Sequence, residues 1–432
     1  MTKTEIVDAA FRVWGRDFYR KTSLSRLAAE LKVSKPALYR HFSSKNALTA
    51  AMTERFFDDF AACIKTDLTG ALEAENPLDG ISVIVKSISG FFARNMNALI
   101  FSLINIYDRN IDGQTITDSL KSRGADMNII QTLIVKKYSD NALIIRLIFA
   151  TLTFLMSHFH RTNLSMKNLP SGEDVNNITS AVWNTVENGL GFTDNTDIEF
   201  ERLEKMVEEM PLNTEQEQAS DGSEGPRFFK AVAEAVAQAG PWDVSMEMVA
   251  KKLGLSKSSL YVHFKNRKDM LRRLFITEFK RIIAFSKRGI SLSSDTKEQL
   301  YLGLFTISVY LRARAEVLIA IDWIRTRKLD LGRTDKYLEI FRLFEDIDIK
   351  LPNLLNERPD DDKRRTSHWV LFLLINVLTH SVPQPSDANK KMAWLCDGLC
   401  MSSGLAVSKN MQNNYIRILY KFVLHGLGGF KK

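Results

Sequence analysis

Residues 23–42 read SLSRLAAELKVSKPALYRHF, and residues 245–264 read SMEMVAKKLGLSKSSLYVHF. The two stretches align without a gap at a separation of 222 residues, and nine of their twenty positions are identical. Solenoid repeats have periods of roughly 20 to 50 residues, so a period this long indicates two copies of a domain-sized unit. The chain therefore carries one module twice.

Each copy has the pattern of two short helices joined by a tight turn. In the first copy, apolar residues recur at helical spacing within 24–31, directly after Ser23, whose hydroxyl is expected to cap that helix. Ser34 is expected to cap the second helix, in which Leu38 and Phe42 share the face that packs on the first. This pattern predicts a helix-turn-helix, whose second helix enters the major groove of DNA with its N-terminus first.

The turn between the two helices differs between the copies. Gly254 suits a turn that needs a positive φ, but the first copy has Lys32 at this position. If the two turns share one backbone conformation, the side chain of Lys32 costs roughly 1 kcal/mol. This difference weakens the first copy without breaking its pattern.

A wider stretch carries a more specific resemblance. AAFRVW (9–14) precedes TSLSRLAAELKVSKPALYRHFSSKNAL (22–48), and the second copy has LYVHF with Arg267 three residues on, as LYRHF has Lys45. Both copies resemble the N-terminal domain of the tetracycline-repressor-like (TetR) family. The resemblance implies an all-α subunit in which a three-helix DNA-binding head precedes a larger helical body that binds an effector and dimerises.

The ends of the two halves also match. Trp183 lies six residues before Gly-Leu-Gly at 189–191, and Tyr420 lies six residues before Gly-Leu-Gly at 426–428. The whole subunit is therefore expected to be duplicated, which predicts an all-α chain of two tandem TetR-like subunits forming an intramolecular pseudo-dimer. The expected divisions are a head over 1–48, a body over 49–192, an acidic linker over 193–226, a second head over 227–271 and a second body over 272–432.

Charge is unevenly distributed along the chain, whose net charge is +8. Residues 1–50 carry ten Lys and Arg against four Asp and Glu, and residues 227–280 carry eleven against five. A basic cluster is often only a solvated face, but its coincidence with the motif in both copies favours a phosphate-binding surface. Residues 193–226 carry eleven acidic and two basic residues. Within them, 198–210 has the pattern of a short amphipathic helix, and 213–225 has the composition of a disordered linker.

The resemblance also implies which side chains contact DNA. Expected phosphate contacts are Lys35, Tyr39, His41 and Lys45 in the first copy, and Lys257, Tyr261, His263 and Arg267 in the second. Residues expected at base edges are Pro36, Ala37 and Arg40 in the first copy, and Ser258, Ser259 and Val262 in the second; Ser23 and Ser245 complete the expected DNA-binding set. The alternative for the two tyrosines and the two histidines is that they only pack against the head.

The two heads share the residues that position them and differ in those that specify sequence. Ala37 suits contact with a thymine methyl and Arg40 suits a guanine or a phosphate, whereas Val262 can make no polar contact. We therefore expect an asymmetric or imperfectly palindromic operator with half-sites about 35 Å apart. In the family, effector binding moves the helix after the motif, here 45–65 and 267–287.

The bodies offer several candidates for the effector pocket but no assignment. Aromatic residues at helical spacing belong to a core more often than to a ligand site, so the ligand-binding residues stay unknown. The candidates are Phe91, Phe92, Met96, Tyr107, Phe154, His158 and His160 in the first body and Tyr310, Asp322, Trp323 and Arg325 in the second.

Other functional classes find little support. No nucleophile–base pair, phosphate loop or metal-ligand spacing indicates an enzyme or a cofactor, and Cys396 and Cys400 lack a second ligand pair. The apolar runs from Ala142 and from Trp369 read as buried helices, since the first contains Arg146 and the second is short. We expect a cytoplasmic, nucleoid-associated chain that is monomeric in solution, with double-stranded DNA and an unidentified small molecule as partners and no membrane.

Two rival hypotheses remain open at this stage. The first is a TetR-like DNA-bound protein that presents a surface to another protein and takes no small-molecule effector. The second is a receptor in which one head no longer binds DNA. Repression or activation, the operator and the regulated genes are not determined by the sequence.

Overall fold

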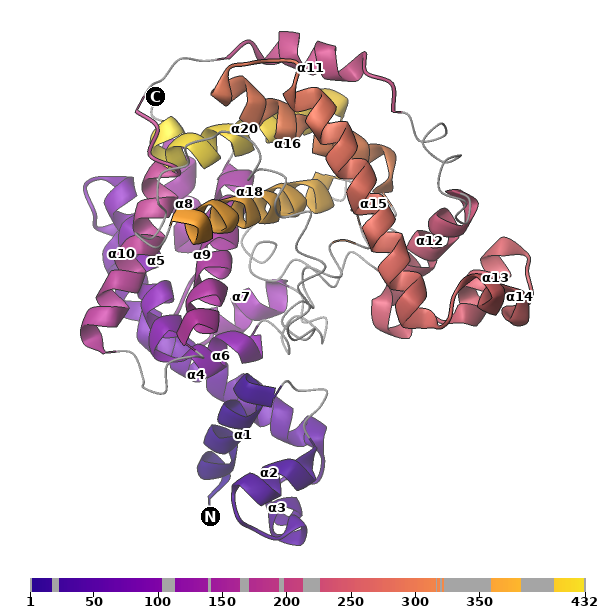
Figure 1. Cartoon of the computed structure of the whole chain (residues 1–432). Coiled ribbons are helices and arrows are strands. Elements are labelled where there is room, and N and C mark those ends of the chain that lie inside the picture. The colour runs from indigo at the N-terminus through magenta and orange to yellow at the C-terminus, as the bar shows by residue number, and fades with distance from the viewer. Residues whose placement is uncertain are drawn as a thin grey trace. The chain divides into compact units, whose positions relative to one another are not determined.

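The structure, a computed structural model, describes residues 2–17, 23–102, 113–138, 141–163, 171–193, 198–212, 226–315, 317–318, 321, 359–381 and 408–430. Every regular element in these ranges is a helix, as the sequence predicts (Figure 1). The chain divides into two compact units, of which the first holds the described residues up to Glu187 and the second holds those from Asn188 onward.

Unit 1 begins with a three-helix head, head 1, and continues into a helical body. A single long helix, α4, runs from the head into the body (Figure 1). The helices are α1 (Lys3–Asp17), α2 (Leu24–Glu30), α3 (Lys35–His41), α4 (Lys45–Leu72), α5 (Pro77–Arg94), α6 (Met96–Phe101), α7 (Gly113–Lys121), α8 (Asn128–Lys137), α9 (Asn141–Asn163) and α10 (Gly172–Asn188).

Unit 2 repeats this order after one additional helix. Its head, head 2, consists of α12–α14, and α15 runs from it into the second body (Figure 1). The helices are α11 (Phe200–Glu208), α12 (Pro226–Asp243), α13 (Met246–Leu253), α14 (Lys257–His263), α15 (Arg267–Ile290), α16 (Thr296–Ala313), α18 (Pro359–Ser381) and α20 (Lys409–His425), and the 3₁₀ helix η8 (Gly426–Phe430) follows α20.

The core of body 1 is aromatic where α4 meets α5. The ring of Phe56 lies 6.1 Å from that of Phe91, and the ring of Phe60 lies 5.0 Å from it. All three side chains are almost fully buried. This packing fixes α4 against the body by area burial and by edge-to-face ring contacts.

The two apolar runs form α9 and α18, and both are largely buried. Ala142–His160 is long and apolar enough to cross a membrane by length and composition alone, but 72% of that window is buried within the protein. Arg146 in α9 and Trp369 in α18 are themselves buried. Both helices are therefore core elements of their units, as the sequence predicts.

The amphipathic helix expected within 198–210 is present as α11, and it is docked rather than free. Leu203 and Val207 are fully buried, and Phe200 packs its ring edge-on against Tyr301 of α16. The buried carboxylate of Glu204 accepts hydrogen bonds from the Tyr301 hydroxyl at 2.6 Å and from Asn413 and Arg417 of α20. Part of the segment expected to be a linker is therefore an element of body 2.

The residues that follow α10 also belong to unit 2 and lie against the end of α20. The backbone N–H groups of Leu190 and Phe192 donate to the carbonyls of Val423 and Leu424. Gly189 has φ +56°, and a Cβ at this position would lie 2.5 Å from the Val423 carbonyl oxygen and 2.6 Å from the nitrogen of Gly426. The Gly-Leu-Gly segments that end the two copies thus approach each other at backbone distance.

Candidate DNA-binding interface

The helix-turn-helix of head 1 is built as its sequence predicts. The Ser23 hydroxyl accepts from the backbone N–H of Arg26, and the Ser34 hydroxyl accepts from that of Ala37, so each helix starts at a capping serine. Leu38 is fully buried and Phe42 nearly so. One face of α3 therefore packs into the head and the opposite face is left for contact.

The turn of head 1 has the strained conformation that the repeat implies. Lys32 has φ +54° and Gly254 has φ +69°. The hydrogen bonds also correspond, since Val33 N–H donates to the Ala28 carbonyl and Leu255 N–H donates to the Ala250 carbonyl, both at 2.9 Å. Both turns are Schellman caps, and the prediction that Lys32 occupies a glycine conformation is confirmed.

Head 2 has the same scaffold with stronger local capping. Ser245 caps α13 and Ser256 caps α14, while Leu260 and Phe264 are fully buried. Asn266 caps α15 and accepts from the backbone N–H of Asp269, whose carboxylate in turn accepts from the N–H of Lys265. These two bonds satisfy the backbone N–H groups of Asp269 and Lys265 at the start of α15.

Most of the expected contact residues of head 1 are accessible to solvent. Ser23, Lys35, Pro36, Tyr39 and Arg40 are exposed, whereas Ala37, His41 and Lys45 are half-buried. The Lys35 ammonium lies 5.8 Å from the centre of the Tyr39 ring, and 42% of Tyr39 is exposed. Tyr39 is therefore available for contact and is not a packing residue.

Some of the corresponding residues of head 2 are exposed, and others are partly buried in the head. Lys257, Ser258, Tyr261 and Val262 are exposed, whereas Ser245, Ser259, His263 and Arg267 are half-buried. The His263 ring lies 4.6 Å from that of Phe228, and Arg267 approaches the Val244 carbonyl at 3.5 Å. Both side chains take part in the packing of the head. For His263 this agrees with the alternative that the histidines pack against the head, whereas packing was not expected for Arg267.

The base-edge positions differ in chemistry as well as in sequence. The Ser256 hydroxyl lies 3.0 Å from that of Ser258 and 2.8 Å from that of Ser259, so all three form one hydroxyl cluster at the start of α14. Val262 is 83% exposed. Head 1 has Arg40 at the position of Val262, so one recognition helix presents a cation where the other presents an apolar side chain.

Comparison with known proteins supports this interpretation of both heads. The family model described as "Bacterial regulatory proteins, tetR family" matches residues 6–52 and residues 229–274. The chain therefore carries two TetR-type DNA-binding domains in tandem, and DNA binding in transcription regulation is the activity of this domain.

Two solved TetR-type structures resemble part of the chain. The TetR family transcriptional regulator PfmR from Thermus thermophilus is 19% identical, with 42% of this chain and 95% of that chain covered and a TM-score of 0.31. The fatty acid degradation regulator FadR from Bacillus halodurans is 17% identical, with 48% and 98% covered and a TM-score of 0.34. No curated protein matches the chain.

Most of the candidate pocket residues that the structure describes are core residues. Buried candidates are Phe91, Phe92, Phe154, His160 and Tyr310, while Met96 and His158 are half-buried. Tyr107, Asp322, Trp323 and Arg325 lie outside the described residues. No group of three or more His, Cys, Asp or Glu side chains in the described part of the chain is placed to hold a metal ion.

Body 2 contains a buried ionic cluster that sequence reasoning missed. Glu278 of α15 is fully buried and accepts from the Tyr310 hydroxyl at 2.8 Å, from Arg281 at 2.9 Å and from Arg314 at 3.2 Å. Burial, together with the nearby Glu278 carboxylate, raises the pKa of Tyr310 above its ordinary value. In the register of the heads Glu278 corresponds to Phe56, so the two bodies hold their long helices by different chemistry.

Proposed function

We propose that this chain is a ligand-responsive repressor whose two non-identical heads read an asymmetric or imperfectly palindromic operator. The observation that carries the proposal is the contrast between the two recognition helices. Their scaffolds correspond residue by residue, but Arg40 faces outward in head 1 and the 83% exposed Val262 faces outward in head 2. Phosphate contacts shared by both heads then position the protein, and unlike base contacts specify two unlike half-sites.

The tandem arrangement supports binding as an intramolecular pseudo-dimer. Two subunits in one chain have an effective concentration of order millimolar, so assembly does not limit DNA binding. Such a protein acts as a monomer in solution, within the cytoplasm and at the nucleoid. An effector bound in a body shifts the equilibrium only by its difference in affinity between the two states, and a hundredfold release of DNA needs about 2.7 kcal/mol.

Selection from random-sequence DNA with the full-length protein tests this function. Two unlike half-motifs at a fixed spacing are expected, and interchangeable half-motifs would contradict the proposal. A single half-motif would show that one head is silent, and no enrichment would favour the protein-interaction hypothesis.

Paired head variants assign each half-motif to its head. Lys35→Ala with Tyr39→Ala is expected to remove one half-motif, and Lys257→Ala with Tyr261→Ala is expected to remove the other. Each pair is the control for the other, since both remove exposed side chains at the same positions of the repeat. Loss of both half-motifs in either variant would show that the heads do not read independently.

A further inference from the structure

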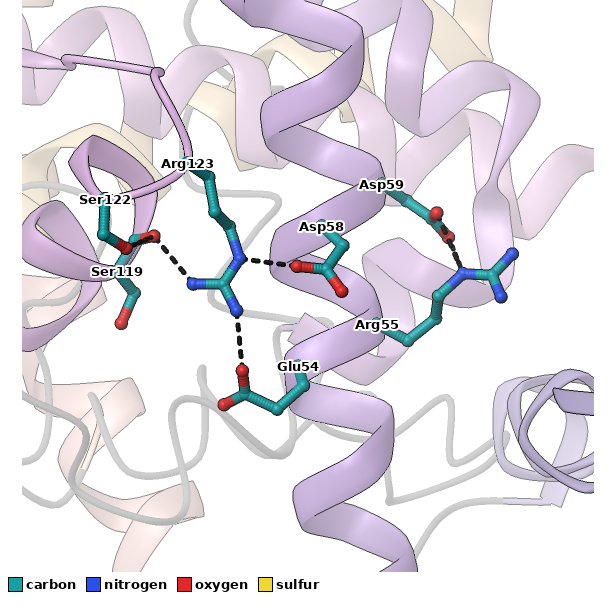
Figure 2. A network of polar contacts seen from close by, with 7 residues as sticks. All are labelled: Glu54, Arg55, Asp58, Asp59, Ser119, Ser122 and Arg123. Carbon is teal, nitrogen blue, oxygen red and sulfur yellow. Dashed lines mark hydrogen bonds and ion pairs between the residues drawn. The ribbon is translucent and has the colours of Figure 1, made fainter. Parts of the chain in front are cut away.

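The long helix of unit 1, α4, is held on its outer side by the side chain of Arg123 (Figure 2). The Arg123 guanidinium contacts Asp58 through Nε and Glu54 through Nη2, each at 2.6 Å, and its Nη1 donates to the Ser119 carbonyl at 2.8 Å. Its central carbon also lies 5.7 Å from the centre of the Phe57 ring. One side chain therefore joins two successive turns of α4 to the end of α7.

The turn that carries Arg123 is hydrogen-bonded and anchored in the body. α7 ends in a Schellman cap, in which Ala125 N–H donates to the Leu120 carbonyl at 3.0 Å and Gly124 takes φ +84°. Leu120 and Ala125 are buried, which anchors this turn in the body. The side chain of Arg123 therefore connects an anchored turn of body 1 to α4.

The positions of α15 that correspond to Glu54 and Asp58 carry no carboxylate. The positions 222 residues after Glu54 and Asp58 are Ile276 and Lys280. The corresponding helix α15 is held instead by the buried Glu278 with Tyr310 and Arg314. The ion pairs of the clamp face solvent, with 68% of the Glu54 side chain and 60% of the Asp58 side chain exposed. They are therefore sensitive to salt in a way that a buried cluster is not.

We propose that Arg123 is a positioning residue that fixes α4, and through it head 1, by an ion-pair clamp whose two carboxylates have no counterpart at the same positions of α15. The two heads of one chain then respond differently to ionic conditions and to movements of their bodies. The effect of this clamp on DNA binding rests on the proposed two-headed function. Its effect on the position of head 1 against body 1 can be measured without DNA and does not rest on that function.

Distances between spin labels within unit 1 test the clamp without DNA. Labels at Ser25→Cys on α2 and Val135→Cys on α8 report head 1 against body 1, because both positions are exposed. Cys63, Cys396 and Cys400 are replaced by serine. The distance distribution is expected to broaden in Arg123→Ala, and an unchanged distribution would overturn the proposal.

The pair of Arg55 and Asp59 provides a matched control (Figure 2). Asp59 lies on α4, is half exposed and pairs with Arg55 of the same helix at 2.7 Å. Asp59→Ala is expected to leave the distance distribution unchanged. Equal broadening in both variants would overturn the proposal, because it would assign the effect to general loss of charge on α4.

Charge and packing are separated by salt and by conservative variants. Raising the salt from about 0.1 to about 1 M shortens the Debye length from about 10 to about 3 Å, which should broaden the parent distribution and leave that of Arg123→Ala unchanged. Arg123→Lys should restore part of the effect, whereas Arg123→Met, which keeps an apolar stem over Phe57, should not. Full restoration by Met would overturn the proposal in favour of packing.

The consequence for DNA is measured with both half-sites on one duplex. Arg123→Ala is expected to weaken protection of the head 1 half-site roughly three- to tenfold and to spare the other half-site. Equal loss at both half-sites would overturn the assignment to head 1. If the parent protein protects only one half-site, the two-headed function fails while the distance result stands on its own.

Discussion

Lys32 adopts a left-handed backbone conformation because its turn has the same backbone geometry as the turn at Gly254. Its φ of +54° places a Cβ where glycine is preferred, as Gly254 demonstrates in the second copy. The repeat register predicted this conformation because the Schellman hydrogen bonds depend on the backbone and not on the side chain.

Replacing this residue gives a direct stability prediction. Lys32→Gly is expected to stabilise head 1 by about 1 kcal/mol, and Gly254→Lys is expected to destabilise head 2 by about the same amount. Hydrogen exchange of the two heads in the full-length chain measures both changes. Destabilisation by Lys32→Gly would contradict the strain account.

Gly189 is constrained by space as well as by its φ of +56°. The nearest atoms to an added Cβ are backbone atoms of Val423, Gly426 and Phe422, which cannot move aside as a flexible side chain can. Gly189→Ala is therefore expected to lower the melting temperature of the chain. Gly70→Ala is the control, because nothing lies within 4 Å of a Cβ at that position and it sits inside a helix. Similar effects of the two changes would contradict this prediction.

Glu278 is a buried charge whose removal should cost considerable stability. Loss of one partner from a buried ion pair leaves the remaining charge without compensation and costs about 3 to 5 kcal/mol. Glu278→Ala is expected to show a loss of this size in denaturant unfolding of unit 2. Glu234→Ala, which removes a more exposed partner of Lys252 at 3.8 Å, should change the unfolding free energy by less than about 1 kcal/mol.

Among the elements, the helix α11 was predicted from the sequence, but its packing partners were not. The positions of Phe200, Leu203 and Val207 predicted an amphipathic helix in an acidic segment. The docking of that helix depends on Tyr301, Asn413 and Arg417, which lie about a hundred to two hundred residues away in the chain. Periodicity identifies a face that needs a partner and carries no information on which partner covers it.

A protease experiment tests the docking of α11. Glu204→Ala removes the acceptor of the Tyr301, Asn413 and Arg417 side chains and should release the helix. Trypsin should then cut faster after Arg202 and Lys205 than in the parent chain. Glu199→Ala, which removes an exposed side chain of the same segment, should leave the cutting rate unchanged.

The long helices α4 and α15 illustrate the same limit. Their starts were predicted from the motif, and the expected head–body boundaries at 48 and 271 fall inside these continuous helices. Arg123 lies 69 residues from Glu54 and 65 from Asp58, so local patterns could not pair them. Within the heads, by contrast, the capping hydrogen bonds that define the motif join residues three positions apart, so local sequence predicted where its helices begin.

At the scale of the whole molecule, both units are expected to lose stability in alkali. Burial, with Glu187 nearby, raises the pKa of Tyr138 in unit 1 to about 12. Burial also raises the pKa values of Tyr301 and Tyr310 in unit 2, to which Glu204 and Glu278 contribute. The folded state therefore favours the neutral phenols over their ionised forms.

The sign of the pH dependence follows from these raised values. The contribution of Tyr138 is fully present below the pKa of an unfolded tyrosine, about 10, and is lost as the pH rises through about 12. Unfolding monitored with tyrosinate absorbance should show these groups ionising together with loss of helix. Normal ionisation near pH 10 in a chain that remains folded would contradict the burial of these three hydroxyls.

The duplication itself was the most predictable property of the whole molecule, because a repeat of 222 residues is visible without any structure. The attachment of residues 188–192 to the end of α20 was not predicted, because these residues were assigned to the first body. Glycines 189 and 426 were identified as matching ends, but only coordinates show them in contact.

The strained Lys32 also bears on how such a chain evolves. In a homodimer every substitution appears in both subunits, so a conformation that costs about 1 kcal/mol would lower the stability of the assembly by about twice that amount. A tandem gene confines the change to one copy, and the glycine at 254 is untouched. In a duplicated chain, each mildly destabilising mutation therefore lowers the stability by half as much as it would in a homodimer. One recognition helix can also change its sequence while the other keeps the original one.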